Sequence, residues 1–300
     1  MRVGVVILPA LPWVEAAPIW RRAELLGAHT AWTYDHLTWR DLRDGPWYAA
    51  VPLLASAAQV TSTMRLGTLV TSPNFRHPVT LAKEVMTLDD LSQGRFTLGI
   101  GAGGTGWDAS ATGQAPWSAA ERTARFAEFV AHLDRLLVEP AVETLAGDYY
   151  RAEGARAVPG CVQRPRVPFA VAGSGPRSIE VAARHGQQWV TFGHPRDASS
   201  QSPAECLQSV RAQLAQLDEA CERLDRDPAS IDRLYLQGLT AEPWLESVGA
   251  FRDLAGAYAD LGFTDLALHW PRAEPPYDAD PDVFEAILAD VGGGETSTRN

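Results

Sequence analysis

The sequence has few cysteines and no excess of positive charge. Only Cys161, Cys206 and Cys221 occur among its 300 residues, and no two of them have Cys-x-x-Cys spacing. A sparse, odd set of cysteines is unusual in an exported protein, so we expect a reduced, cytoplasmic chain. The net charge is −11. This argues against a nucleic-acid partner, because nucleic-acid binding usually needs a basic face.

Long apolar runs and metal-binding spacings are also missing. No segment approaches about 18 consecutive apolar residues, so no membrane-spanning helix is expected. The first residues, MRVGVVILPALPW, have neither the basic leader nor the apolar length of a signal peptide. The seven histidines show no HxH or HExxH pattern. His194 and His269 each follow a predicted strand, but a metal-dependent hydrolase is the weaker interpretation, and we expect no metal.

What the sequence does contain is a regular alternation of short apolar runs and longer helical patterns. The short runs are nearly continuously apolar, as is typical of parallel strands covered on both faces. We predict strands at 2–8, 30–34, 65–70, 96–101, 168–173, 188–193, 233–238 and 265–270. We predict helices at 17–26, 47–60, 80–91, 119–137, 177–184, 206–224 and 247–261. Gly27, Gly186 and Gly262 are typical helix ends, and SAAE at 118–121 has the spacing of a capping box.

Eight such alternations with no second compositional block predict a single (β/α)8 TIM barrel at residues 1–291. The weaker alternative is an open doubly wound sheet. Nearly 70 residues separate the fourth and fifth strands. Residues 104–166 are therefore predicted to include an insertion that caps the barrel mouth as a lid. Residues 292–300 are predicted to be a disordered tail.

In a barrel, chemistry belongs at the carboxyl ends of the strands. The stretch WTYDHLTWRD places Asp35 and His36 just past the second strand. A histidine there can exchange protons near neutral pH, and a neighbouring carboxylate can orient its ring. The alternative is a surface Asp–His pair that caps the next helix. His36 is the candidate catalytic residue.

The glycine-rich stretch LGIGAGGTGWD follows the fourth strand. Its glycines let the backbone approach a flat ligand or a phosphate. Gly99, Gly101 and Gly104 have GxGxxG spacing, but Gly99 lies inside the strand and the next clear helix waits for Ser118. A dinucleotide-binding interpretation is therefore weak. A flexible loop without a ligand is the alternative.

A second glycine loop, AVAGSGPRS, follows the fifth strand and is the better anion site. Ser174 or Gly175 can cap the next helix, and Pro176 suits its first position. The free N–H groups of that helix, together with Ser174 and Arg177, are well suited to a phosphate. The alternative is an ordinary strand-to-helix turn that binds nothing.

Two further features can line the mouth. In TSPNFRHP, after the third strand, Arg76 and His77 can face an acidic ligand group or simply belong to a loop shaped by prolines. Trp39 and Trp107 are placed to line the mouth and are the candidate substrate-binding residues. They suggest a substrate with an apolar or planar surface.

Taken together, these residues resemble the luciferase-like flavin oxidoreductases, which include bacterial luciferase and the deazaflavin (coenzyme F420) enzymes. The resemblance runs through nearly the whole chain in order and is most specific from Thr61 to Gly103. It is carried by YDHL, TSTMRLGTLVTSPNFRHPVTLAKEVMTLDDLSQGRFTLGIGAG, ERTARFAEFVAHLDRLL, GDYYRAEGARAVPGCVQRPRVPFAVAGSG and GFTDLAL.

The resemblance implies a barrel that binds a reduced flavin or deazaflavin at the strand carboxyl ends. It places the cofactor phosphate at the second glycine loop and the ring over the ends of the third and fourth strands. It also implies a cis peptide between Leu69 and Val70, and a catalytic His36. The residues expected at the cofactor, from the strand ends and the resemblance together, are Asp35, Leu69, Val70, Thr71, Gly101, Gly103, Gly104, Gly173, Ser174, Gly175 and Arg177.

One departure from the family limits what carries over. The sugar-phosphate dehydrogenases of the deazaflavin branch have a glutamate where this chain has Gly104, so their acid–base scheme is not expected here. The Asp–His pair favours F420 over FMN. We therefore expect F420-dependent hydride transfer with a small organic substrate. An FMN-dependent monooxygenase and a non-catalytic flavin-binding barrel are the alternatives. The resemblance also implies a homodimer and a separate reductase that supplies reduced cofactor.

Overall fold

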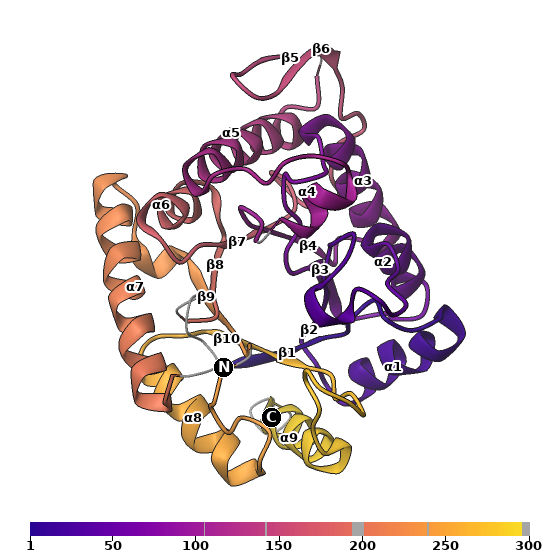
Figure 1. Ribbon diagram of the computed structural model, residues 1–300, viewed down its shortest axis with the longest axis vertical. Helices are drawn as coiled ribbons and strands as arrows, with labels where there is room; N and C mark the ends of the chain where they lie inside the picture. Colours follow the sequence, from indigo (N-terminus) through magenta and orange to yellow (C-terminus); the bar gives the residue numbers. More distant parts are fainter. Residues whose placement is uncertain (105, 142, 194–200, 239, 296–300) are drawn as a thin grey trace.

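The structure is a computed structural model that describes residues 1–104, 106–141, 143–193, 201–238 and 240–295. Within them, eight parallel strands close into a barrel, and the first strand pairs with the last (Figure 1). The predicted (β/α)8 barrel is confirmed, and the open sheet is wrong. In order around the barrel, the strands are β1 (Arg2–Val6), β10 (Asp265–His269), β9 (Asp232–Leu236), β8 (Gln188–Thr191), β7 (Phe169–Ala172), β4 (Phe96–Ile100), β3 (Arg65–Thr68) and β2 (Thr30–Thr33).

Helices surround the barrel as a ring (Figure 1). Their main members are α1 (Trp13–Leu25), α2 (Ala50–Ala58), α3 (Pro78–Leu91), α5 (Ala119–Val138), α6 (Pro176–His185), α7 (Pro203–Arg223), α8 (Val248–Asp260) and α9 (Pro281–Glu295). A short 3-10 turn, η3 (Pro228–Ser230), precedes β9. The seven predicted helices are all present, with ends shifted by a few residues.

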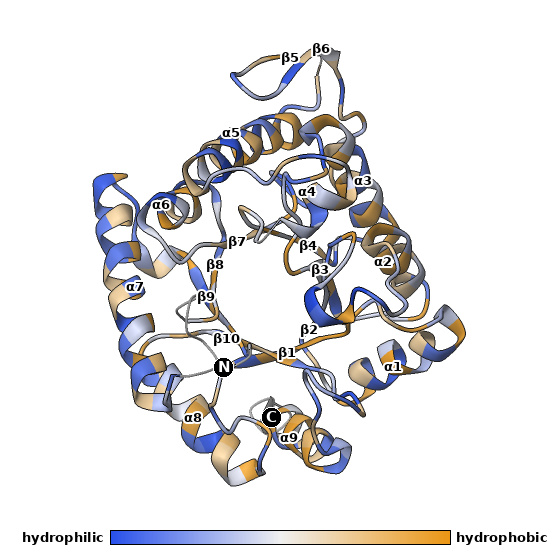
Figure 2. Cartoon of the chain, viewed as in Figure 1, coloured by the Kyte–Doolittle hydropathy of each residue, from blue (hydrophilic) through white to orange (hydrophobic). Residues whose placement is uncertain are grey.

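The ring helices are amphipathic, which explains how they pack. Hydrophilic and hydrophobic residues alternate along α5 and α7 (Figure 2). In α5 the buried residues are Phe126, Phe129, Val130, Leu133, Leu136 and Leu137. Ser118 begins this helix by accepting a hydrogen bond from the Glu121 N–H, so the predicted cap is present.

The core has two layers, one between strands and helices and a smaller one inside the barrel. Trp32, Tyr34 and Leu69 belong to the inner layer. The Trp32 ring occupies space that Gly67 leaves open, because a Cβ at Gly67 would lie 2.6 Å from Trp32 Cε3. Large side chains therefore fill the barrel interior, and ligands are left to the mouth.

The insertion between β4 and β7 has two structured parts that lie apart. Helix α4 (Trp107–Ala111) lies inside the helix ring, whereas the hairpin of β5 (Glu143–Ala146) and β6 (Arg151–Ala155) projects beyond α5 (Figure 1). Glu128 of α5 holds this hairpin by accepting hydrogen bonds from the N–H groups of residues 148–150. Of the region predicted as a lid, the segment around α4 is the part inside the helix ring, and the lid itself stays a prediction.

The C-terminal helix α9 was not among the predicted helices. α9 runs to Glu295, so residues 292–295 do not belong to a disordered tail. A Cβ at Gly292 would lie 3.3 Å from the Leu26 carbonyl oxygen, which shows how closely α9 approaches the end of α1. Residues 296–300 lie outside the described residues. No helix in the described part of the chain combines the length and the apolarity needed to cross a bilayer.

Candidate active site

His36 lies at the carboxyl end of β2 and is held on several sides. Its Nδ1 is 2.7 Å from the Oδ2 of Asp108, and Trp39 stacks on its ring at a centroid distance of 4.5 Å. Trp47 donates a hydrogen bond to the His36 carbonyl oxygen. The imidazole is 11% exposed. Its Nε2 makes no hydrogen bond within the described ranges but is reached by solvent, so this nitrogen is the free one.

Asp35 does not orient His36, contrary to expectation. Successive residues of extended backbone point to opposite sides, and Asp35 turns toward β3. There it accepts hydrogen bonds from Arg76 Nε and Nη2 at 2.7 and 2.8 Å, and from the Thr71 hydroxyl at 2.8 Å. The carboxylate is buried and fully engaged, so its observed role is to join β2 to the loop after β3.

The same contacts answer the question about Arg76 and His77. Arg76 also reaches Glu84 of α3 at 2.5 Å, so its guanidinium is committed within the protein. Burial raises the pKa of Glu84, and the Arg76 charge opposes that shift. His77 begins α3, with Nδ1 accepting from the Val79 N–H. The His77 ring also packs edge-on against Tyr150 at 5.7 Å.

The ends of β3 and β4 form a close-packed backbone surface beside His36. The Thr71 N–H donates to the Gly99 carbonyl, and a Cβ at Gly101 would lie 2.8 Å from Val70 Cγ2. Gly103 has φ +78°, and a Cβ there would overlap the Asn74 amide. A Cβ at Gly104 would meet nothing within 4 Å. The structure therefore brings these predicted residues together around an open space at Gly104.

The second glycine loop joins β7 to α6 at the same end of the barrel. Gly173 packs against the first turn of α6, where a Cβ would lie 2.7 Å from the Ser178 carbonyl carbon. The Ser178 hydroxyl accepts a hydrogen bond from the Gly175 N–H, and no N-cap side chain takes the N–H groups of Arg177 and Ser178, which stand at the helix start. Ser174 is half-buried in this loop. The loop has the predicted form of an anion site.

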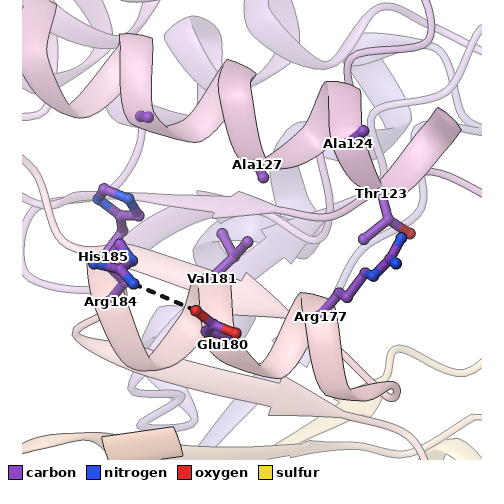
Figure 3. Close-up of a pocket in the computed structure, with 9 residues that line it drawn as sticks. Thr123, Ala124, Ala127, Arg177, Glu180, Val181, Arg184 and His185 are labelled. Atoms are coloured by element: carbon purple, nitrogen blue, oxygen red, sulfur yellow. Dashed lines mark hydrogen bonds and ion pairs between the residues drawn. The ribbon is translucent and has the colours of Figure 1, made fainter. Parts of the chain in front are cut away.

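Arg177 is directed away from that loop. Figure 3 shows it beside Thr123 of α5, at one end of a groove between α5 and α6 whose other end is lined by Arg184 and His185. The groove has an alanine-rich wall from α5. The loop and helix terminus are therefore placed as predicted, whereas the Arg177 side chain lies along the helix ring.

Of the two mouth tryptophans, only Trp39 touches the candidate catalytic group. Besides His36, it packs edge-on against Tyr34 at 5.1 Å. Trp107 begins α4, is 38% exposed and carries the Arg43 guanidinium at 4.9 Å from its ring centroid. Trp39 thus contacts the candidate catalytic residue, and Trp107 contacts Arg43.

A buried polar network completes the opposite wall. The Tyr34 hydroxyl lies 2.8 Å from His269 Nε2, and His269 Nδ1 lies 3.1 Å from Gln237 Oε1. Tyr277 stacks on the His269 ring at 3.6 Å. Burial lowers the pKa of His269 to about 3, so it is neutral at physiological pH.

His269 belongs to no candidate metal site among the described residues. Across the residues for which positions are given, no group of three His, Cys, Asp or Glu side chains could hold a metal ion. His194, the other histidine placed after a strand, lies outside the described residues.

A sequence profile described as luciferase-like monooxygenase matches residues 1–236. The chain belongs to this family. It is 31% identical over 296 residues to an F420-dependent glucose-6-phosphate dehydrogenase of Beutenbergia cavernae, covering 84% of this chain and 86% of that protein. It is 34% identical over 291 residues to a protein of the same name from Kineococcus radiotolerans, covering 92% and 83%.

A solved structure supports the fold assignment. The F420-dependent secondary alcohol dehydrogenase in complex with an F420-acetone adduct aligns with a TM-score of 0.78, over 96% of this chain and 98% of that one. The identity is 18%, so this likeness concerns the fold alone. The Leu69–Val70 peptide bond of this luciferase-like chain is cis, as the resemblance implied.

Sequence reasoning missed several residues of the site. Asp108 stands in the glycine-rich stretch that was singled out, but nothing in its spacing connects it with a histidine 72 residues earlier. The signal that was present is an acid directly after Trp107, in a segment expected at the mouth. Tyr277 and Gln237 carried no signal, because their contacts with His269 depend on how separate loops meet.

Proposed function

We propose that this luciferase-like chain is an F420-dependent oxidoreductase that transfers a hydride between the deazaflavin and a small organic substrate. The observation that carries the proposal is His36, whose free Nε2 lies at the mouth beside the glycine-lined ends of β3 and β4. Support comes from two relatives above 30% identity whose names specify F420.

The residues present fit such a cofactor. The space at Gly104 and the Cβ-free backbone at Gly101 and Gly103 suit a flat ring laid against the strand ends. The first turn of α6 suits a phosphate, through the N–H groups of Arg177 and Ser178. When bound, reduced F420 would supply a hydride, and oxidised F420 would accept one.

The protein's own groups would handle the accompanying proton and the geometry. His36 Nε2 would hold the proton or release it, while Trp39 covers one face of the imidazole. The neutral His269 network would keep the Tyr34 side of the mouth rigid. The α4 segment would exclude water from the site.

The proposal also covers the setting of the enzyme. Cys161, Cys206 and Cys221 are all buried and free, which supports a cytoplasmic location. We extend the proposal to a homodimer that receives reduced cofactor from a separate reductase.

The same family supports a second candidate, an FMN-dependent monooxygenase, since the matching profile is described by that activity. The absorbance spectrum of protein purified from a host that makes both cofactors separates the two. A deazaflavin spectrum supports the proposal, and a flavin spectrum favours the monooxygenase. A non-catalytic carrier would release reduced cofactor without speeding its reoxidation by any acceptor.

The role of His36 has its own test. With glucose 6-phosphate and propan-2-ol as probe substrates, we expect His36→Ala to lower the hydride-transfer rate by roughly 10²–10⁴-fold. Its affinity for F420 should stay near that of the wild type. A variant that turns over as fast as the wild type would remove His36 from the mechanism.

A further inference from the structure

The carboxylate of Asp108 receives two hydrogen bonds from consecutive residues of the β2 loop. Its Oδ2 lies 2.7 Å from His36 Nδ1, and its Oδ1 accepts from the Leu37 N–H at 2.8 Å. Asp108 is 1% exposed. Both oxygens are therefore committed to one short stretch of chain, away from solvent.

This arrangement determines which nitrogen of His36 carries the proton. An ionised carboxylate only accepts hydrogen bonds, so Nδ1 must be the donor in the contact with Oδ2. In neutral imidazole the other nitrogen is then unprotonated. Since Nε2 makes no hydrogen bond within the described ranges, it is the nitrogen left to exchange a proton at the mouth.

The ring is also prevented from turning over. Trp39 stacks on it with an interplanar angle of 29°, and Tyr34 meets it edge-on at 6.2 Å. A half-turn of the ring about Cβ–Cγ would put Cδ2 in the place of Nδ1 and lose the hydrogen bond to Asp108, and the turning ring would have to leave the Trp39 stack. Orientation and tautomer are thus set together.

From these contacts we infer that Asp108 is a positioning residue, which holds His36 with Nδ1 protonated and Nε2 facing the mouth. This inference rests on the proposed function for its catalytic meaning. Asp108 itself does not face the mouth and acts only through His36. A carboxylate that orients a histidine and selects its tautomer has the same role in serine-protease triads.

The position of Asp108 in the chain links its contact with His36 to the glycine-rich stretch. Asp108 belongs to α4, which directly follows the glycine-rich stretch expected under the cofactor ring. Gly106 packs against Pro116, where a Cβ would lie 2.8 Å from Pro116 Cβ. The glycine-rich stretch expected under the ring therefore leads directly into the helix whose Asp108 contacts His36.

Asp108→Asn is the sharpest variant. The amide oxygen can still accept from the Leu37 N–H, which leaves an NH₂ group facing His36 Nδ1. Two donors cannot bond each other, so His36 must move its proton to Nε2. A purely structural role for Asp108, holding α4 to the β2 loop, predicts no such change of tautomer.

The experiment is ¹⁵N NMR of histidine-labelled protein without cofactor, at a pH that leaves the imidazole neutral. His36→Gln assigns the His36 signals, and Ser110→Ala, at an exposed site on the same helix, is the matched control. We expect the Nδ1-protonated form in the wild type and in Ser110→Ala, and the Nε2-protonated form in Asp108→Asn. An Nε2-protonated wild type, or an unchanged tautomer in Asp108→Asn, overturns the inference.

Two provisions keep this test decisive. If Asp108→Asn does not fold, the wild-type tautomer alone decides: protonation at Nδ1 supports the inference, and protonation at Nε2 overturns it. F420 binding to the same wild-type sample is measured separately by fluorescence. If the proposed function is wrong, the fluorescence titration will show no F420 binding, whereas the NMR result on the His36 tautomer will be unchanged.

Discussion

Arg76 donates hydrogen bonds from Nε and Nη2 to the carboxylate of Asp35, and both side chains are largely buried. This pair joins the end of β2 to the loop after β3, so it fixes the backbone on which His36 and the cis Leu69–Val70 peptide stand. It is an ion pair that stabilises the loops around the site.

Arg76→Ala tests this stabilising role. The substitution leaves the Asp35 carboxylate buried without its ion partner, which typically costs about 3–5 kcal/mol. We expect the free energy of unfolding, measured by urea denaturation, to fall by that order. Arg223→Ala, at an exposed position near the end of α7, should change it by no more than about 0.5 kcal/mol. If the two variants lowered the free energy of unfolding equally, the buried Asp35–Arg76 pair would not stabilise the fold more than an exposed arginine does.

The depressed pKa of His269 predicts a pH dependence of stability. In the unfolded chain a histidine titrates near pH 6.5, whereas His269 in the fold binds a proton only near its pKa of about 3. Between these values the unfolded state binds more protons. Stability is therefore lost as pH falls through this window, by up to about 1.4 kcal/mol per pH unit from this residue.

Denaturation of wild type and His269→Gln at several pH values between 7 and about 4 measures this slope. The wild type should lose stability more steeply than the variant. Parallel slopes would mean that His269 takes up protons in the folded state as readily as in the unfolded one.

The hydrogen bonds of Glu128 suggest a variant that destabilises the β5–β6 hairpin and leaves cofactor binding unchanged. Glu128→Ala removes the acceptor for three N–H groups of the turn at 148–150. We expect faster hydrogen exchange at 143–155 and unchanged F420 affinity, because the hairpin lies outside the helix ring. If loosening the hairpin weakened cofactor binding, it would be part of the lid after all.

Two glycines of the same loop form a matched pair for the cofactor position. Gly104→Ala meets no atom within 4 Å, so stability should stay within about 0.5 kcal/mol while F420 affinity falls. Gly103→Ala is strained by its positive φ and by Asn74, so it should destabilise the fold as well. Normal F420 affinity in Gly104→Ala would place the ring elsewhere.

The barrel could be predicted from the sequence because parallel strands buried on both faces have short, nearly continuous apolar sequences. All eight runs became barrel strands. The hairpin could not, since RAEGA of β6 is largely exposed and carries no apolar pattern. Helix α9 was not predicted, and its GGGE end resembles a tail, although Gly292 packs closely against the end of α1.

The sequence predicted where the candidate site lies, but not which carboxylate contacts His36. His36 and the glycine loops follow strands, and strand ends meet at one face of a barrel. That Asp108 rather than Asp35 binds His36 depends on where α4 folds back over the mouth. Sequence neighbours on extended backbone face opposite ways, so adjacency of Asp35 and His36 was a poor guide to contact.

The central claim is that this mouth binds a deazaflavin for hydride transfer. Titration of the pure protein with F420 and, separately, with FMN tests it most directly, with binding followed by cofactor fluorescence. The account predicts that F420 binds at least about tenfold more tightly than FMN, a difference of about 1.4 kcal/mol. Tight binding of FMN with no measurable affinity for F420 would contradict it.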